Sequence, residues 1–119
     1  MKGIPYRVGL WILFVFPFVQ AAEAQAFSAN EIVPFCQLFL TGQMKENLSG
    51  AGQCLGSMQT IVTVGEELPP PYKFCMPAAA TVQQAMRVVV TSALSHPENM
   101  HSNFVDVATR ALAGVWPCR

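Results

Sequence analysis

Charged side chains are scarce in this sequence, and neither sign dominates. Only 12% of the 119 residues are charged, and 7 lysines and arginines balance 7 acidic residues. A nucleic-acid-binding domain usually carries a basic face, and a disordered chain combines low hydrophobicity with high net charge. Because 52% of the residues are apolar and the formal net charge is zero, neither class fits. We therefore expect one small domain with no nucleic-acid partner.

The sequence also lacks an apolar run long enough to cross a bilayer. The best candidate, residues 8–19, has 12 residues, whereas a membrane-spanning helix needs about 20. Basic residues precede this run and small residues follow it, which is the layout of a secretory signal peptide. We predict that residues 1–24 are cleaved off, with Ala26 as an alternative cleavage site. No membrane anchor would then remain, and residues 25–119 would form a single exported domain.

No C-x-x-C pair occurs among the cysteines, so their spacing offers neither a zinc knuckle nor a thioredoxin-like redox site. All four lie in the exported part, where oxidising conditions make structural disulfides the default. They are Cys36, Cys54, Cys75 and Cys118. Three connectivities can join four cysteines in two bridges, and the spacing alone does not choose among them.

Apolar residues recur at helical spacing in four segments of the exported part. Only residues 60–64 would fit a strand equally well. The residues expected to face inward are Ile32, Phe35, Cys36, Phe39 and Leu40 in the first segment, Cys54, Leu55, Met58, Ile61 and Val62 in the second, Val82, Ala85, Met86, Val89 and Ala93 in the third, and Met100, Phe104, Val107, Ala108, Ala111, Leu112 and Val115 in the fourth. The pattern predicts an all-α protein.

Local signals suggest where these helices begin and end. Ser28 with Glu31, and Thr81 with Gln84, have the spacing of capping boxes, although Pro34 could delay the start of the first helix by a turn. The glycine-rich stretch 42–52 is expected to form a turn between the first two helices. The third helix should run from Thr81 to about Leu94 and stop before the His96-Pro97 pair.

The helix order favours one pairing of the cysteines. Cys36 and Cys54 lie on the apolar faces of the first two helices, which a short connection folds into an antiparallel hairpin. Cys75 precedes the third helix and Cys118 follows the fourth, so a second hairpin brings these two together. We therefore expect a small disulfide-stabilised four-helix domain built from two helical hairpins.

Residues that could support catalysis or bind a metal or cofactor form no convincing set. His96 and His101 are five positions apart across a proline, whereas two metal ligands on one helical face need a spacing of three or four. We therefore expect no enzyme activity, no catalytic residue, no metal and no cofactor. Residues 65–74 contain three consecutive prolines, which favour a stiff, extended backbone. This segment is either a linker between the hairpins or a loop that recognises a partner.

The C-terminal half resembles the Tai/Rap immunity proteins of type VI secretion amidase toxins. The matching residues include Phe74-Cys75-Met76-Pro77, Gln84, His96-Pro97-Glu98, His101, Ala111-Leu112 and Trp116-Pro117-Cys118. They follow the family's order and spacing from residue 74 to residue 118. The N-terminal half fits through Cys36 and Cys54, but Ser57 and Thr60 stand where the family pattern has an aromatic residue and a glycine.

The resemblance implies a periplasmic, all-helical protein that binds a peptidoglycan amidase effector and occludes its active site. It also implies that the protein can form a homodimer and that a protruding loop enters the cleft of the toxin. Our candidate for that loop is the charged, proline-rich segment formed by Glu66, Glu67, Leu68, Pro69, Pro70 and Tyr72. The recurring motif residues are expected to be structural: Pro77, Gln84, His96, Pro97, Glu98, Trp116 and Pro117.

Two alternatives use the same scaffold. One is a periplasmic stress chaperone, which should expose apolar surface when its carboxylates are protonated. Only six acidic side chains remain after residues 1–24 are removed, which is few for such a trigger. The other is an envelope-binding protein that no longer recognises a toxin, an alternative that the departures at Ser57 and Thr60 keep open.

Overall fold

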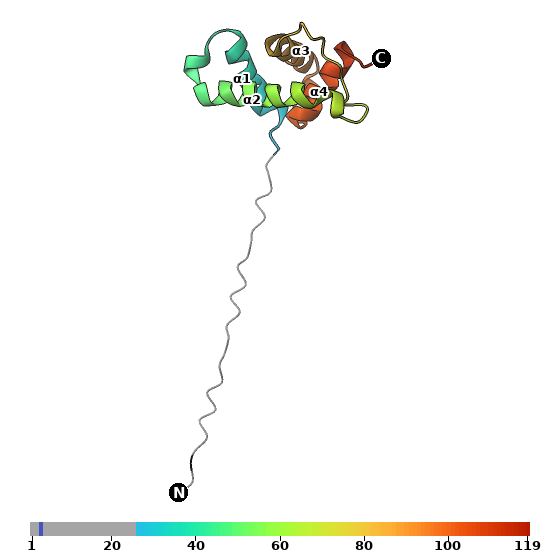
Figure 1. Cartoon of the computed structure of the whole chain (residues 1–119). Coiled ribbons are helices and arrows are strands. Elements are labelled where there is room, and N and C mark those ends of the chain that lie inside the picture. The colour runs from blue at the N-terminus through green and yellow to red at the C-terminus, as the bar shows by residue number, and fades with distance from the viewer. Residues whose placement is uncertain (1–2, 4–25) are drawn as a thin grey trace.

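The computed structural model describes residues 26–119 and Gly3, so the predicted signal peptide lies outside the described residues (Figure 1). Residues 26–119 form four α-helices and three short 3-10 helices, with one isolated β-bridge between Ser28 and Asn103. The α-helices are α1 (Ala29–Leu40), α2 (Leu48–Val64), α3 (Val82–Ser95) and α4 (Phe104–Val115). The 3-10 helices are η1 (Met44–Glu46), η2 (Gly65–Glu67) and η3 (Pro97–Asn99). The all-α prediction is confirmed, and residues 60–64 are helical.

The helices pair as two hairpins that share one core. Contacts are densest between α1 and α2 and between α3 and α4, and α1 also packs against α3 and α4. Disulfides join Cys36 to Cys54 and Cys75 to Cys118, with Cα–Cα distances of 5.2 and 4.9 Å. Both expected pairings are confirmed. The sequence separations of 18 and 43 residues correspond to about 3 and about 4 kcal/mol of stabilisation, mostly by restricting the unfolded chain.

The first helix begins where its capping box predicts, and Pro34 does not delay it. The backbone amide of Ser28 donates to the Glu31 carboxylate at 2.8 Å. The amides of Ala29 and Asn30 donate to the carbonyls of Ser102 and Met100 at 2.9 and 2.8 Å, so the turn before α4 satisfies two donors that a helix start leaves unpaired. Pro34 lies inside α1 at an exposed position, and the capped first turn is already fixed before it.

The start of α2 differs from the expected boundary. The helix begins at Leu48, so half of the predicted glycine-rich turn is helical. Asn47 caps the helix and so sets its start, because its side-chain oxygen accepts from the amide of Gly50 at 2.8 Å. The ring of Phe35 from α1 lies directly over Gly50, in the space that a Cβ atom would need. Glycine at this position therefore allows α1 and α2 to approach closely.

The fourth helix is also shorter than its apolar pattern suggested. It starts at Phe104, since the Asn103 side chain accepts from the amide of Val105 at 2.8 Å and caps the helix there. Met100 lies before the helix but still packs against the core. Val115 was expected to face inward and is instead 53% exposed, because it is the last helical residue before the chain turns away at Trp116. Among the described residues, no helix has the length and apolarity needed to span a membrane.

Two glycines of α2 provide a test of this packing. Replacing Gly50 by Ala places a methyl group against the Phe35 ring, and we expect a net destabilisation of about 1–2 kcal/mol. Gly52→Ala is the matched control, because nothing lies within 4 Å of its added Cβ and the better helix former should stabilise the protein by up to about 1 kcal/mol. Urea unfolding of both variants measures the difference. Equal stabilisation by the two substitutions would contradict the close approach at Gly50.

Candidate partner-binding surface

The loop between the two hairpins is closed at its base by its first and last residues. The amide of Phe74 donates to the Gly65 carbonyl at 3.2 Å. The Phe74 ring is buried and lies against the α-carbon of Gly65, where a larger residue would collide with it. Figure 1 shows this segment, in yellow-green, at the end of the molecule where α2 finishes. The loop therefore projects from a fixed base.

The prolines do not form the extended segment that the sequence predicted. The chain turns back at Pro69–Tyr72, where the Tyr72 amide donates to the Pro69 carbonyl at 3.0 Å and the Pro70–Pro71 peptide bond is cis. This turn brings the Tyr72 side chain back to α4. The loop is therefore not an extended polyproline segment. Its shape is held by the turn and by the contacts that Tyr72 makes with α4.

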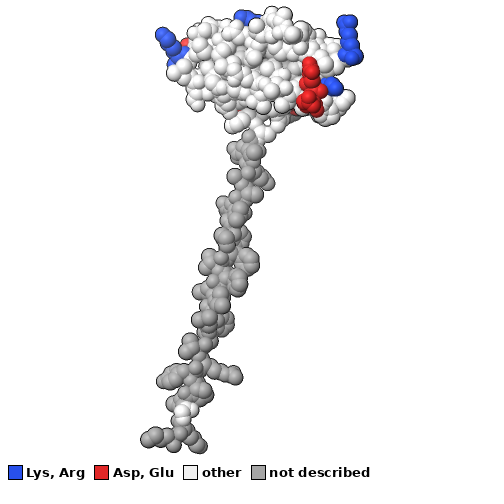
Figure 2. Space-filling view, viewed as in Figure 1, with Lys and Arg blue, Asp and Glu red and all other residues white. Residues whose placement is uncertain are grey.

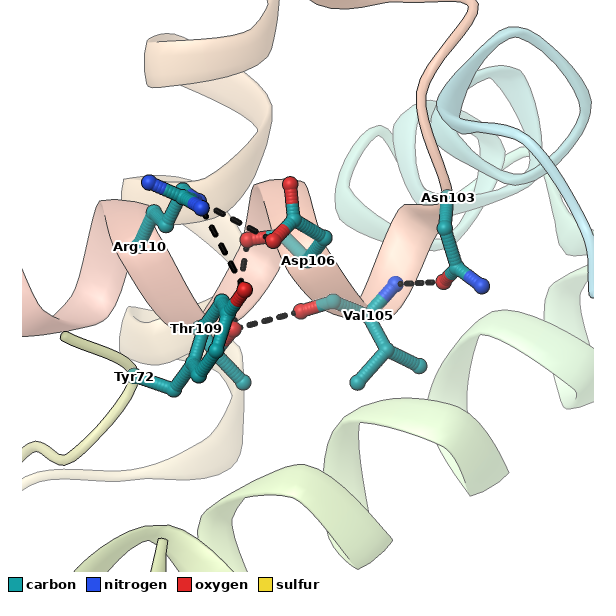
Figure 3. A network of polar contacts seen from close by, with 6 residues as sticks. All are labelled: Tyr72, Asn103, Val105, Asp106, Thr109 and Arg110. Carbon is teal, nitrogen blue, oxygen red and sulfur yellow. Dashed lines mark hydrogen bonds and ion pairs between the residues drawn. The ribbon is translucent and has the colours of Figure 1, made fainter. Parts of the chain in front are cut away.

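A polar network fastens the loop to α4 (Figure 3). The Arg110 guanidinium donates to the Tyr72 hydroxyl at 3.3 Å and lies 5.0 Å from the centroid of its ring. The same guanidinium pairs with the Asp106 carboxylate at 3.0 Å, one helical turn earlier. The hydrogen bond to Asp106, and after it the one to Tyr72, raises the pKa of Arg110 above its ordinary value. Arg110 is therefore charged at neutral pH.

The candidate loop residues divide into anchors and free side chains. Tyr72 and Leu68 are half-buried, and Leu68 packs against the core. Glu66, Glu67, Pro69 and Pro70 are exposed. Figure 2 shows few charges on the visible face, and at the end of the molecule where the loop lies acidic side chains stand next to basic ones. With Glu66 and Glu67 against the exposed Lys73, the loop offers a partner a restrained projection of slight negative charge.

A shallow, mainly apolar depression lies beside the loop. Its nearer part, of about 310 Å³, is lined by Leu68, Tyr72, Asn103, Val105, Asp106 and Thr109. A second part, of about 510 Å³, shares Val105 and continues along α2, where it is lined by Gly52, Gln53, Gly56, Ser57, Thr60, Ile61 and Val64. Ser57 and Thr60, which depart from the family pattern, therefore lie on this surface. Neither residue belongs to the buried core cluster.

The recurring motif residues lie at helix ends and turns. Gln84 completes the cap of α3, because its side chain accepts from the Thr81 amide at 2.7 Å. His96 ends α3, and its Nδ1 lies 2.9 Å from the Ser92 carbonyl. Trp116 follows α4, and its carbonyl accepts from the Cys75 amide at 2.8 Å. Pro77 accepts in a turn from the Ala80 amide at 3.0 Å. The remaining three, Pro97, Glu98 and Pro117, are exposed.

Sequence reasoning missed the part played by α4 in this surface. The spacing of Asp106 and Arg110 is the i,i+4 spacing of a helical ion pair, so that contact could have been found. The contact of Arg110 with Tyr72 spans 38 residues and leaves no local signal. Among residues 26–119, no group of His, Cys, Asp and Glu side chains is arranged to hold a metal ion.

Comparison with known proteins assigns the scaffold to a family. The model of the family described as Rap1a immunity proteins matches residues 28–118. This range begins at the cap of α1, includes all four α-helices and ends at the second cysteine of the second disulfide. No curated protein and no solved structure matches the chain.

The Arg110 network gives a prediction for the loop. Arg110→Gln removes both contacts to Tyr72, so amide hydrogen exchange in residues 66–73 should rise several-fold while the melting temperature changes little, because the ion pair is exposed. Arg87→Gln is the control, since Arg87 lies on α3 and makes no hydrogen bond or ion pair with residues 66–73. Exchange measured by mass spectrometry distinguishes the variants. Unchanged exchange in the Arg110 variant would mean that the network does not restrain the loop.

Proposed function

Because the chain belongs to the Rap1a immunity protein family, we propose that it binds and blocks a peptidoglycan amidase delivered by a type VI secretion system. An immunity protein of this kind acts by binding a secreted effector and needs no catalytic residue of its own. Occlusion of the amidase active site is the mechanism that we propose. The observation that carries this proposal is a projecting acidic loop with a fixed base, beside an apolar depression.

The loop meets two physical requirements of a tight inhibitor. Its base at Phe74 and its contact with Arg110 fix its shape, so little conformational entropy is lost on binding. The exposed Glu66 and Glu67 side chains place negative charge on the projection, which steers encounter with a positively charged partner surface. Burial of apolar area in the adjacent depression would then supply affinity. We infer that the loop enters the cleft of the effector and that the depression contacts its rim.

Periplasmic action requires export, and the N-terminal sequence supports it. We propose that residues 1–24 or 1–26 are a cleaved signal peptide and that the mature domain acts in the periplasm. Peptidoglycan lies in that compartment, and two disulfides are in keeping with an oxidising environment. The chaperone alternative gains no support, because none of the acidic side chains in residues 26–119 is buried and could expose the core when protonated.

Inhibition of peptidoglycan hydrolysis tests the proposed function. The oxidised mature protein should inhibit one amidase, from a panel of type VI amidases that includes those of the same genome, at a ratio near one to one. Glu67→Lys should weaken inhibition roughly ten-fold or more, because it reverses charge on the projecting loop. Glu46→Lys is the matched control: Glu46 is exposed and precedes α2, whose length of 17 residues places it roughly 25 Å from the loop. Equal effects of the two variants would exclude the loop as the binding element, and no inhibition by the unaltered protein would refute the immunity role.

Export can be checked separately from inhibition. The protein recovered from the periplasm should have a mass that corresponds to a start at Gln25 or Phe27, after cleavage behind Ala24 or Ala26. Intact-mass measurement under non-reducing conditions should also show a mass lower by four hydrogens, since each disulfide removes two. A periplasmic or membrane-bound product that keeps residues 1–24 would contradict the cleaved signal.

A further inference from the structure

The two disulfides differ in their access to solvent. Cys36 and Cys54 have no exposed surface and lie within the hydrophobic core between α1 and α2. Cys75 and Cys118 are both partly exposed. Cys118 also lines an open hollow of about 390 Å³ together with Pro70, Pro71, Lys73, Ala113 and Pro117. One bridge is thus enclosed by the fold, and the other faces a hollow that an incoming molecule can enter.

This difference decides which bridge can react with a thiol. Disulfide exchange requires a thiolate to approach one sulfur along the line of the S–S bond, so access controls its rate. A buried bridge becomes reactive only after the surrounding structure opens. At the open bridge, Lys73 lines the same hollow as Cys118, and its positive charge attracts an anionic thiolate. The charge also stabilises the thiolates that the reaction leaves behind.

We propose that the Cys75–Cys118 bridge is a site of thiol–disulfide exchange with a protein dithiol, and that Cys36–Cys54 is closed to this reaction. The first thiolate of the partner attacks Sγ of Cys118, an S–S bond forms between them, and Cys75 leaves as a thiolate. The second thiolate of the partner then attacks the partner's own sulfur in the mixed disulfide and releases Cys118 as a thiolate. The partner ends as a disulfide, and the two protein thiolates take up the protons that its thiols gave up.

Exchange at this bridge would loosen the loop without unfolding the domain. Cys75 follows the loop directly, and its amide holds the segment after α4 through the Trp116 carbonyl. The Cys36–Cys54 bridge and the Phe74 ring are buried in the core, so we expect them to stay in place when Cys75–Cys118 opens. If the loop binds the effector, opening the bridge lowers the affinity of the complex. This last consequence rests on the proposed function, whereas the selective exchange does not.

Timed reduction of the oxidised protein tests the selectivity. Dithiothreitol is the dithiol probe, N-ethylmaleimide stops the reaction, and peptide mass mapping follows each cysteine. We expect Cys75 and Cys118 to be labelled roughly ten-fold faster or more than Cys36 and Cys54, with the helical circular dichroism retained. Labelling of all four cysteines at one rate, or labelling that coincides with loss of helicity, would overturn the proposal.

Two further measurements separate the parts of the argument. Lys73→Gln should slow labelling of Cys75 and Cys118 several-fold. Lys45→Gln, the control at an exposed lysine in η1, should not change the labelling rate. Equal rates in both variants would show that Lys73 does not promote the exchange. The selectively reduced protein should then inhibit the amidase more weakly than the oxidised protein does. Equal inhibition by the two forms would overturn only the link to binding. Failure of the oxidised protein to inhibit would count against the proposed function and leave the labelling result standing.

Discussion

The contact between Phe74 and Gly65 is the constraint on which the candidate surface depends. The Phe74 ring is 1% exposed, and its burial contributes about 2–3 kcal/mol. Because the ring occupies the space beside the Gly65 α-carbon, the end of α2 and the start of the segment before α3 are held together. Eight residues between these two points have both ends fixed to the core. The Tyr72–Arg110 contact and the Cys75–Cys118 bridge then act on a loop whose position is already defined.

The scaffold follows from local patterns in the sequence. In α1 the buried residues Ile32 and Cys36 are separated by one helical turn, and in α2 Cys54 and Met58 repeat that spacing. These stripes require the two faces to meet, and the facing cysteines then pair. The start of α2 was harder to predict than these stripes, because glycine-rich stretches usually form turns. Packing of Phe35 on Gly50 and the Asn47 cap override that tendency here.

The candidate surface could be predicted only in part. The composition of residues 66–72 identified the loop, because consecutive prolines and adjacent acidic residues are local features. Its shape was not predictable, since it depends on a turn at Pro69–Tyr72 and on a side chain 38 residues further along the chain. Ser57 and Thr60 line the depression beside the loop, and neither side chain belongs to the buried core.

Survival of cells that carry the effector in their own periplasm tests the central claim most directly. The amidase that the oxidised protein inhibits would be directed to the periplasm in a strain that lacks the chain. The account predicts lysis of that strain, survival when the exported chain is supplied, and lysis again when the chain is supplied without residues 1–24 and stays in the cytoplasm. Lysis despite the exported chain would contradict the account, and so would protection by the cytoplasmic form.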